Sequence, residues 1–192
     1  MMPRPPIIPT IIVLGAVGVM IWLGLWQLER REQKAALLTR YHQAVAMSAE
    51  VPFPADDARA ETMLYRHARL TCARPSNLSS MAGANAEGDP GLAVTAECDL
   101  GQGNRTTVVL GWSRAPVTPD WRGGEVRGVI APPDRNGPRL IAALPLAGLE
   151  ANALPDPSDI SDNHLAYAVQ WFFFAAAALV IYALALARRA RK

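Results

Sequence analysis

Two long stretches without charge lie near the two ends of the chain and dominate its pattern of hydrophobic and polar residues. The first covers residues 7–28 and the second covers residues 165–187. Each would form a helix of roughly 33 Å, which is enough to cross the roughly 30 Å of hydrocarbon in a bilayer. The pattern therefore predicts two transmembrane helices, with the segment between them leaving and re-entering the membrane on one side.

The first span is expected to continue as a helix beyond the membrane. Residues 29–49 contain no Gly or Pro and favour a helical extension, which the prolines Pro52 and Pro54 would end. A short second helix is expected around residues 58–63, with Asp56 or Asp57 as its N-cap.

Residues 50–163 predict one β-rich domain. Alternating apolar residues, broken by Gly- and Pro-rich turns, predict strands over residues 65–73, 92–100, 106–113, 125–131 and 139–144. Short strands at such spacing are typical of an antiparallel sheet or a small barrel. The predicted fold class is a membrane α+β protein, in which N- and C-terminal transmembrane helices flank one antiparallel, β-rich domain.

Charge along the chain predicts an orientation in the membrane. All 17 Asp and Glu residues lie between Glu29 and Asp162, whereas five of the 19 Lys and Arg residues lie in the two tails. The mild positive charge is therefore a property of the tails and does not indicate nucleic-acid binding. Cationic tails favour the cytoplasm, and long loops translocate largely regardless of their charge. We expect a multi-pass protein of a bacterial inner membrane, with both termini cytoplasmic and the central domain periplasmic.

The first apolar run is longer than the 7–15 residues of a signal peptide, so we expect the span to be retained. The only two cysteines, Cys72 and Cys98, lie on the apolar faces of two expected strands. Two interpretations remain open for them: a disulfide formed in an oxidising compartment, or two small buried hydrophobic residues. Neither cysteine has the C-x-x-C or paired-His context of a metal site.

Polar and aromatic residues gather where the two spans would meet the outer membrane surface. Helical spacing places one stripe on each span, made of Gly15, Val19, Trp22, Trp26 and Arg30 on the first, and His164, Ala168, Trp171, Ala175 and Tyr182 on the second, with Tyr167 beside it. Such stripes suit packing of the two helices against each other or against a partner. An interfacial aromatic belt would also explain the tryptophans, but Gln27 and Gln170 need hydrogen-bond partners.

His164 has three physical interpretations. It is the first-turn residue of a helix capped by Ser161 or Asp162, a polar anchor against lipid headgroups or a partner protein, or a ligand of a metal or haem iron. The sequence offers no other metal site, because the remaining histidines, His42 and His67, are expected at solvated positions.

Three short motifs lie at defined places relative to these elements. The first span ends in Gly24-x-Trp26-Gln27-x-x-Arg30-x-x-x-Lys34, the second opens with Asn163-His164-Leu165-x-Tyr167-Ala168-x-Gln170-Trp171-Phe172, and Gly111-Trp112 lies in the middle domain. Together with the two spans around a strand-rich domain, these motifs resemble the Surfeit locus protein 1 family.

Members of that family assist the assembly of haem–copper cytochrome c oxidase in respiratory chain biogenesis, and the resemblance implies the same role here. It implies haem a as a transient cofactor passed toward catalytic subunit I, with the haem a synthesis and delivery machinery as further partners. His164 would be the iron ligand, beside the rings of Trp26, Tyr167 and Trp171. Arg30 or Lys34 would then pair with the haem propionates. The resemblance gives Gly24, Gln27, Asn163, Gln170, Gly111 and Trp112 no separate task.

One position departs from the family pattern: Leu110 precedes Gly111-Trp112, where the family commonly has Arg. An enzyme is not expected, because the sequence has no G-x-S-x-G elbow, no phosphate-binding loop and no H-E-x-x-H motif. The leading interpretation is a non-enzymatic, membrane-anchored assembly factor that helps to deliver or insert haem a. The alternative is a cofactor-free membrane scaffold that docks on a partner complex through its two helices.

Overall fold

The computed structural model describes residues 6–101, 103–134 and 137–191, which divide into two compact units. The first unit combines both ends of the chain, up to Leu37 and from Ile160 onward. The second unit is Leu38–Asp159.

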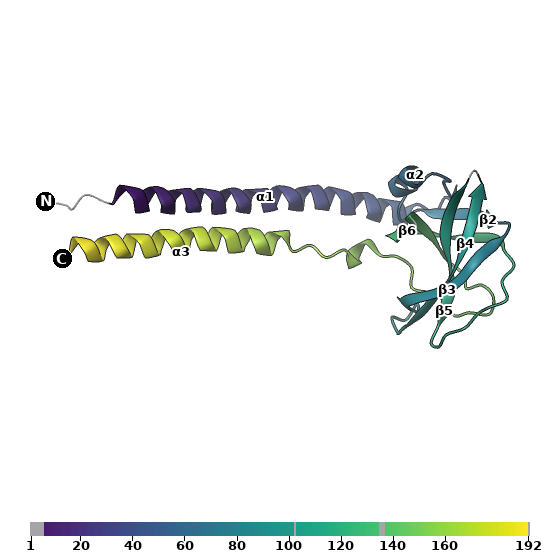
Figure 1. Cartoon of the computed structure of the whole chain (residues 1–192). Helices are drawn as coiled ribbons and strands as arrows, with labels where there is room; N and C mark the ends of the chain where they lie inside the picture. Colours follow the sequence, from purple (N-terminus) through teal and green to yellow (C-terminus); the bar gives the residue numbers. More distant parts are fainter. Residues whose placement is uncertain (1–5, 102, 135–136, 192) are drawn as a thin grey trace. The chain divides into compact units, whose positions relative to one another are not determined.

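Two long helices make up most of the first unit (Figure 1). Helix α1 runs without a break over Ile7–Ala46, and helix α3 covers His164–Ala190. Both are long and apolar enough to cross a membrane. Large apolar side chains on them face outward, with Ile7 exposed by 74% and Phe173 by 68%. A soluble core helix would bury such residues, so this exposure suits helices surrounded by lipid.

Helices α1 and α3 run antiparallel (Figure 1). Three side-chain contacts join them. The Thr10 hydroxyl lies 2.5 Å from the Tyr182 hydroxyl, Gln27 contacts His164, and Lys34 donates to the carbonyl of Ser161. From one contact to the next, the residue numbers rise along α1 as they fall along the C-terminal segment, so the contacts follow one continuous seam. Because the two helices are antiparallel, the N-terminal end of α1 and the C-terminal end of α3 lie at the same end of this unit.

Small side chains at heptad spacing form the seam between the helices. Val17 and Gly24 on α1 are seven residues apart, as are Ala168 and Ala175 on α3, and all four are buried. Small residues allow two helix backbones to approach closely in a membrane. A Cβ atom on Gly24 would lie 2.6 Å from the ring of Phe172, so a larger residue at this position requires that ring to move.

The stripe expected on the first span points elsewhere. Gly15, Val19, Trp22, Trp26 and Arg30 are all exposed, and a Cβ atom on Gly15 would meet nothing within 4 Å. These residues do not pack against α3. A transmembrane helix is apolar all round, so its periodicity does not show which face a neighbouring helix will cover.

A sheet of seven strands organises the described part of the second unit (Figure 1). Its spatial order is β1-β2-β6-β7-β5-β4-β3. The strands are β1 (Val51–Pro52), β2 (His67–Cys72), β3 (Pro75–Ala84), β4 (Pro90–Gly101), β5 (Asn104–Ser113), β6 (Gly124–Asp134) and β7 (Gly137–Ala142). Helix α2 (Asp57–Thr62) connects β1 to β2, and its N-cap is Asp56, whose carboxylate accepts from the backbone N–H groups of Ala58 and Arg59.

The expectation of a purely antiparallel sheet is wrong, because the sheet is mixed. Strand β1 pairs with β2 in parallel, and β5 pairs with β7 in parallel. A crossover that contains α2 makes the first parallel pair sterically accessible. The second arises because the β6–β7 hairpin inserts beside β5, so that two strands distant in sequence become neighbours. Strand order of this kind is set by the shared core rather than by local turns.

The edge strand β3 lies in a segment that was expected to be a loop. Its residues are mostly exposed and are rich in Ser, Asn and Ala. Because neither of its faces is deeply buried, the sequence shows no alternation of apolar and polar residues. The adjacent β4 does alternate, and it pairs with β3 over most of its length.

A disulfide joins Cys72 at the end of β2 to Cys98 on β4, with 5.3 Å between their Cα atoms. Both cysteines are fully buried, as are the core residues Val108 and Leu140. The bond connects strands on opposite sides of the β6–β7–β5 centre of the sheet. It therefore ties the two flanks of the sheet together within the core.

Candidate functional site

His164 is the first residue of α3, and its position follows from how that helix begins. The N-cap residue is Asn163, whose side chain makes no capping hydrogen bond. The carboxylate of Asp162 instead accepts a hydrogen bond from the backbone N–H of His164, at 3.1 Å. A negative side chain at this end also complements the helix dipole. The imidazole is thereby held at the start of an apolar helix.

The imidazole of His164 contacts the amide of Gln27 on α1, with 2.7 Å between Nδ1 and Oε1. An amide oxygen only accepts hydrogen bonds, so Nδ1 carries the proton. The neutral ring then has its lone pair on Nε2. This is the arrangement that histidine ligands of metals adopt, with one nitrogen oriented by a hydrogen bond and the other left for the metal.

Basic residues lie on α1 one to two turns beyond Gln27. The guanidinium of Arg30 lies 5.4 Å from the ring centre of Trp26, and it donates to the side-chain oxygen of Gln33 at 3.1 Å. The ammonium of Lys34 donates to the backbone carbonyl of Ser161, just before α3 begins. Lys34 therefore ties the end of the connecting segment to α1, while Arg30 keeps further N–H donors for an anion.

The expected site residues on α3 divide between two faces. His164 and Trp171 are partly buried on the side near α1, and Trp171 packs edge-to-face on Phe174 with 6.2 Å between ring centres. Tyr167 and Gln170 are exposed. The structure thus brings Gln27 and His164 into contact at one end of the helix pair. Trp26 and Arg30 lie at the same end but are exposed on α1, and Tyr167 and Gln170 are exposed on α3.

Gly111 and Trp112 belong to the core of the second unit. Trp112 is 1% exposed and packs over Gly91, where a Cβ atom would lie 2.4 Å from the indole. Backbone hydrogen bonds between Trp112 and Glu150 run in both directions. A Cβ atom on Gly111 would lie 2.7 Å from the carbonyl oxygen of Glu150, so this glycine allows a close backbone approach. Leu110, which replaces the common Arg, is fully buried.

Two contacts between the helices were not anticipated from the sequence: Lys34 with Ser161, and Thr10 with Tyr182. The sequence carries only a weak signal for these contacts. Thr10 and Tyr182 are hydroxyl-bearing residues within long apolar runs, where an isolated polar group needs a partner. Their distance from the Gln27–His164 contact, 17 residues along α1, corresponds to roughly 26 Å of helix.

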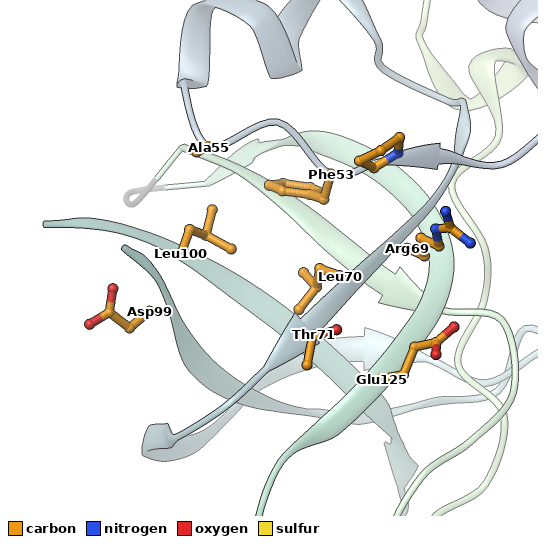
Figure 2. Close-up of a pocket in the computed structure, with 9 residues that line it drawn as sticks. Phe53, Ala55, Arg69, Leu70, Thr71, Asp99, Leu100 and Glu125 are labelled. Carbon is orange, nitrogen blue, oxygen red and sulfur yellow. The ribbon is translucent and has the colours of Figure 1, made fainter. Parts of the chain in front are cut away.

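A groove of about 510 Å³ lies on the second unit (Figure 2). Phe53, Leu70 and Leu100 gather around its middle, and Asp99 and Glu125 lie at its margins. Asp99 accepts from the backbone N–H of Gly101 at 2.7 Å, and Glu125 pairs with Arg127 at 2.9 Å. Both carboxylates therefore serve local structure. Among the described residues, no cluster of three or more His, Cys, Asp or Glu side chains is arranged to hold a metal ion.

Comparison with known sequences identifies the family. No curated protein matches the chain. The model of the SURF1 family matches residues 14–176, a range that contains both helical signatures and the Gly111-Trp112 motif. The chain therefore belongs to the SURF1 family, whose members are membrane-associated assembly factors for cytochrome oxidase rather than a family of catalysts.

Proposed function

We propose that this chain is a non-enzymatic assembly factor that assists the delivery or insertion of haem a into catalytic subunit I of cytochrome c oxidase. The observation that carries the proposal is the hydrogen bond between Gln27 and His164. It orients an imidazole at the start of α3 and leaves the lone pair on Nε2. An axial ligand of haem iron binds the metal through such a lone pair.

The neighbouring side chains suit the rest of such a cargo. Trp171, on the side of α3 near α1 and two turns after His164, offers a flat apolar surface, and the guanidinium of Arg30, one turn beyond Gln27, would be a partner for a propionate. Lys34 also donates to the Ser161 carbonyl, and both Lys34 and Arg30 have further N–H donors for a propionate. The chain's own contribution is to hold and orient the haem and to shield its edge from water.

The proposed location is a bacterial inner membrane, with both termini in the cytoplasm and the second unit in the periplasm. The cationic residues Arg188, Arg189 and Arg191 at the end of α3 favour the cytoplasmic side. The bond between Cys72 and Cys98 supports a periplasmic second unit, because disulfides persist in oxidising compartments.

The decisive experiment is optical. The full chain is purified from cells that make haem a, and its Soret absorbance per protein is compared with that of His164→Ala and of the control His42→Ala, which changes an exposed histidine. We expect the wild type and His42→Ala to carry haem and His164→Ala to lose most of it at unchanged yield. Undiminished haem in His164→Ala would remove the ligand role.

A cofactor-free scaffold is the second candidate function, and the exposed Tyr167 and Gln170 on α3 favour it. These polar side chains sit on an apolar helix without serving the His164 contact. A colourless wild-type preparation that still co-purifies oxidase subunits would support the scaffold. Normal oxidase subunit levels with reduced haem a content, in cells lacking the chain, would support haem handling instead.

A further inference from the structure

Helix α3 has a second face that α1 does not cover. Its residues follow one another at alternating intervals of three and four, which is the heptad spacing of a helix–helix seam. Ala168 and Ala175, which pack near α1, lie on a different side of the helix. The uncovered face, called here the Gln170 face, consists of Tyr167, Gln170, Phe174, Ala177, Ile181 and Leu184.

The large side chains of the Gln170 face are exposed. Tyr167 is 52% exposed, Phe174 42%, Ile181 67% and Leu184 57%. Lipid alone would account for the apolar ones, since hydrocarbon is as good a neighbour for them as another helix. The apolar residues therefore do not say what covers this face. Gln170, the polar residue within the face, indicates which kind of neighbour suits it.

Gln170 is the informative residue of this face. It lies six residues after the start of α3, roughly 9 Å along the helix, and apolar residues follow it. Within the described residues, its side-chain amide makes no hydrogen bond. An amide that faces hydrocarbon without a partner costs free energy, because no water can satisfy its donor and acceptor. The face is therefore suited to a neighbour that supplies both an acceptor and a donor at this depth.

We propose that a second copy of this chain covers the Gln170 face, through a parallel pair of α3 helices related by a two-fold axis. A primary amide is its own complement, because its N–H₂ donates and its carbonyl oxygen accepts. Two copies inserted in the same orientation place Gln170 at the same depth. Each Gln170 then bonds the other, which is the self-complementary contact of a two-fold interface.

The rest of the face fits this pairing. Ala177 is small and sits two turns beyond Gln170, so it allows close approach of the two helices. Tyr167 and Phe174 flank Gln170 and would meet their own equivalents across the axis. One polar residue in an otherwise apolar seam also fixes the register of two helices, as a buried Asn does in coiled coils. The proposal is independent of haem binding, since the His164 contact with Gln27 lies on another face.

Cysteine cross-linking tests the geometry. The two native cysteines are bonded to each other, so a single introduced cysteine reports only on contacts between copies. In membranes containing the full chain, we expect Tyr167→Cys and Phe174→Cys to form disulfide-linked dimers at least about tenfold faster than Val169→Cys and Ala176→Cys. The latter two positions are exposed and lie off both faces. Equal rates at all four positions, or no dimer at any, would overturn the proposal.

A second measurement tests the amide itself. The dimer fraction of the full chain is measured by single-molecule photobleaching at several protein-to-lipid ratios. We expect Gln170→Leu to weaken dimerisation roughly tenfold, a loss on the scale of one or two interhelical hydrogen bonds, and Gln170→Asn to retain it. Unchanged dimerisation of Gln170→Leu contradicts the proposal. So does a monomeric wild type whose co-purification with another membrane subunit is lost in Gln170→Leu, because that subunit's helix would then cover the face.

Discussion

The Nδ1 atom of His164 donates to the Oε1 atom of Gln27 across 2.7 Å, although the two residues are 137 positions apart in the chain. This bond joins the N-terminal signature motif to the closing motif. It also determines the tautomer of the imidazole, since the amide oxygen can only accept. The two motifs thus meet in one hydrogen-bonded pair. Gln27 orients the imidazole ring of His164, and the ring presents its other nitrogen.

Replacing Gln27 by Leu is expected to weaken haem binding without abolishing it. The leucine removes the acceptor that holds the ring, and loss of such a supporting hydrogen bond typically lowers the affinity of a metal–histidine site about 10- to 100-fold. Haem titration of the purified full chain, followed by the Soret band, measures the change. The matched control is Gln43→Leu, which removes an exposed glutamine of the same helix. Equal affinities for Gln27→Leu and wild type would show that the ring needs no such support.

Replacing Gly24 by Ala is expected to push α1 and α3 apart. The new Cβ atom would lie 2.6 Å from the ring of Phe172, and overpacking of this kind typically costs about 1–3 kcal/mol. Thermal unfolding of the full chain in detergent measures the loss. Gly18→Ala is the control, because nothing lies within 4 Å of its added Cβ atom, and its melting temperature should not fall.

A second substitution separates the effect of packing against Phe172 from the effect of helix propensity at residue 24. Phe172→Ala removes the ring that the new methyl group would strike. We therefore expect Gly24→Ala to be less destabilising in a Phe172→Ala background than in the wild type, a coupling typical of residues in contact. Additive effects of the two substitutions would mean that the helices are not held together at this point.

Some elements follow from local sequence, and these could be predicted. The apolar length of residues 7–28 and 165–187 predicts two spanning helices, and α1 and α3 match it. Asp56 predicts the start of α2, because its carboxylate can cap the first free N–H groups. Strands β2, β4, β5, β6 and β7 also lie within or around the predicted segments, since each buries at least one face.

Other features depend on distant parts of the chain, and these could not be predicted. The parallel pairing of β5 with β7 depends on where a hairpin inserts, and the exposed β3 has no alternation to reveal it. In the site, topology predicted that Gln27 and His164 would lie at similar depth. Their direct contact depends on how each helix is rotated about its axis, and an apolar helix offers several equivalent faces. For the same reason, the spacing predicts a packing stripe that includes Gly15, Val19 and Trp22, whereas in the structure this stripe faces away from α3.

Removing the disulfide is expected to destabilise the second unit. Cys72 and Cys98 are 26 residues apart, and closing a loop of that length stabilises a fold by about 3.5 kcal/mol through the unfolded chain. Replacing both cysteines with alanine should lower the free energy of unfolding by this order, as measured by urea denaturation of the full chain in detergent. The reduced wild type should behave like the double variant. Equal stability of the oxidised and reduced wild type would contradict this role.

Asp156 is expected to make the stability of the second unit depend on acid pH. It precedes the short 3₁₀ helix η1 (Pro157–Asp159), and its carboxylate accepts from the backbone N–H of Ser158 at 2.8 Å. This bond, with a smaller contribution from the Ser158 side chain, lowers the pKa of Asp156 below its ordinary value of 3.8. A lowered pKa means that the ionised carboxylate favours the folded state. The resulting stability is fully present above the ordinary pKa and is lost as the pH falls through the lower folded-state pKa.

The corresponding experiment compares melting temperatures of the full chain from about pH 6 to well below the ordinary pKa of 3.8, because the folded-state pKa is lower. We expect the wild type to lose stability on acidification more steeply than Asp156→Asn, because the variant has no carboxylate to protonate. Ser158→Ala should give an intermediate slope, since it removes the hydroxyl and keeps the backbone N–H. Parallel curves for the wild type and Asp156→Asn would mean that the Ser158 contact does not couple this carboxylate to folding.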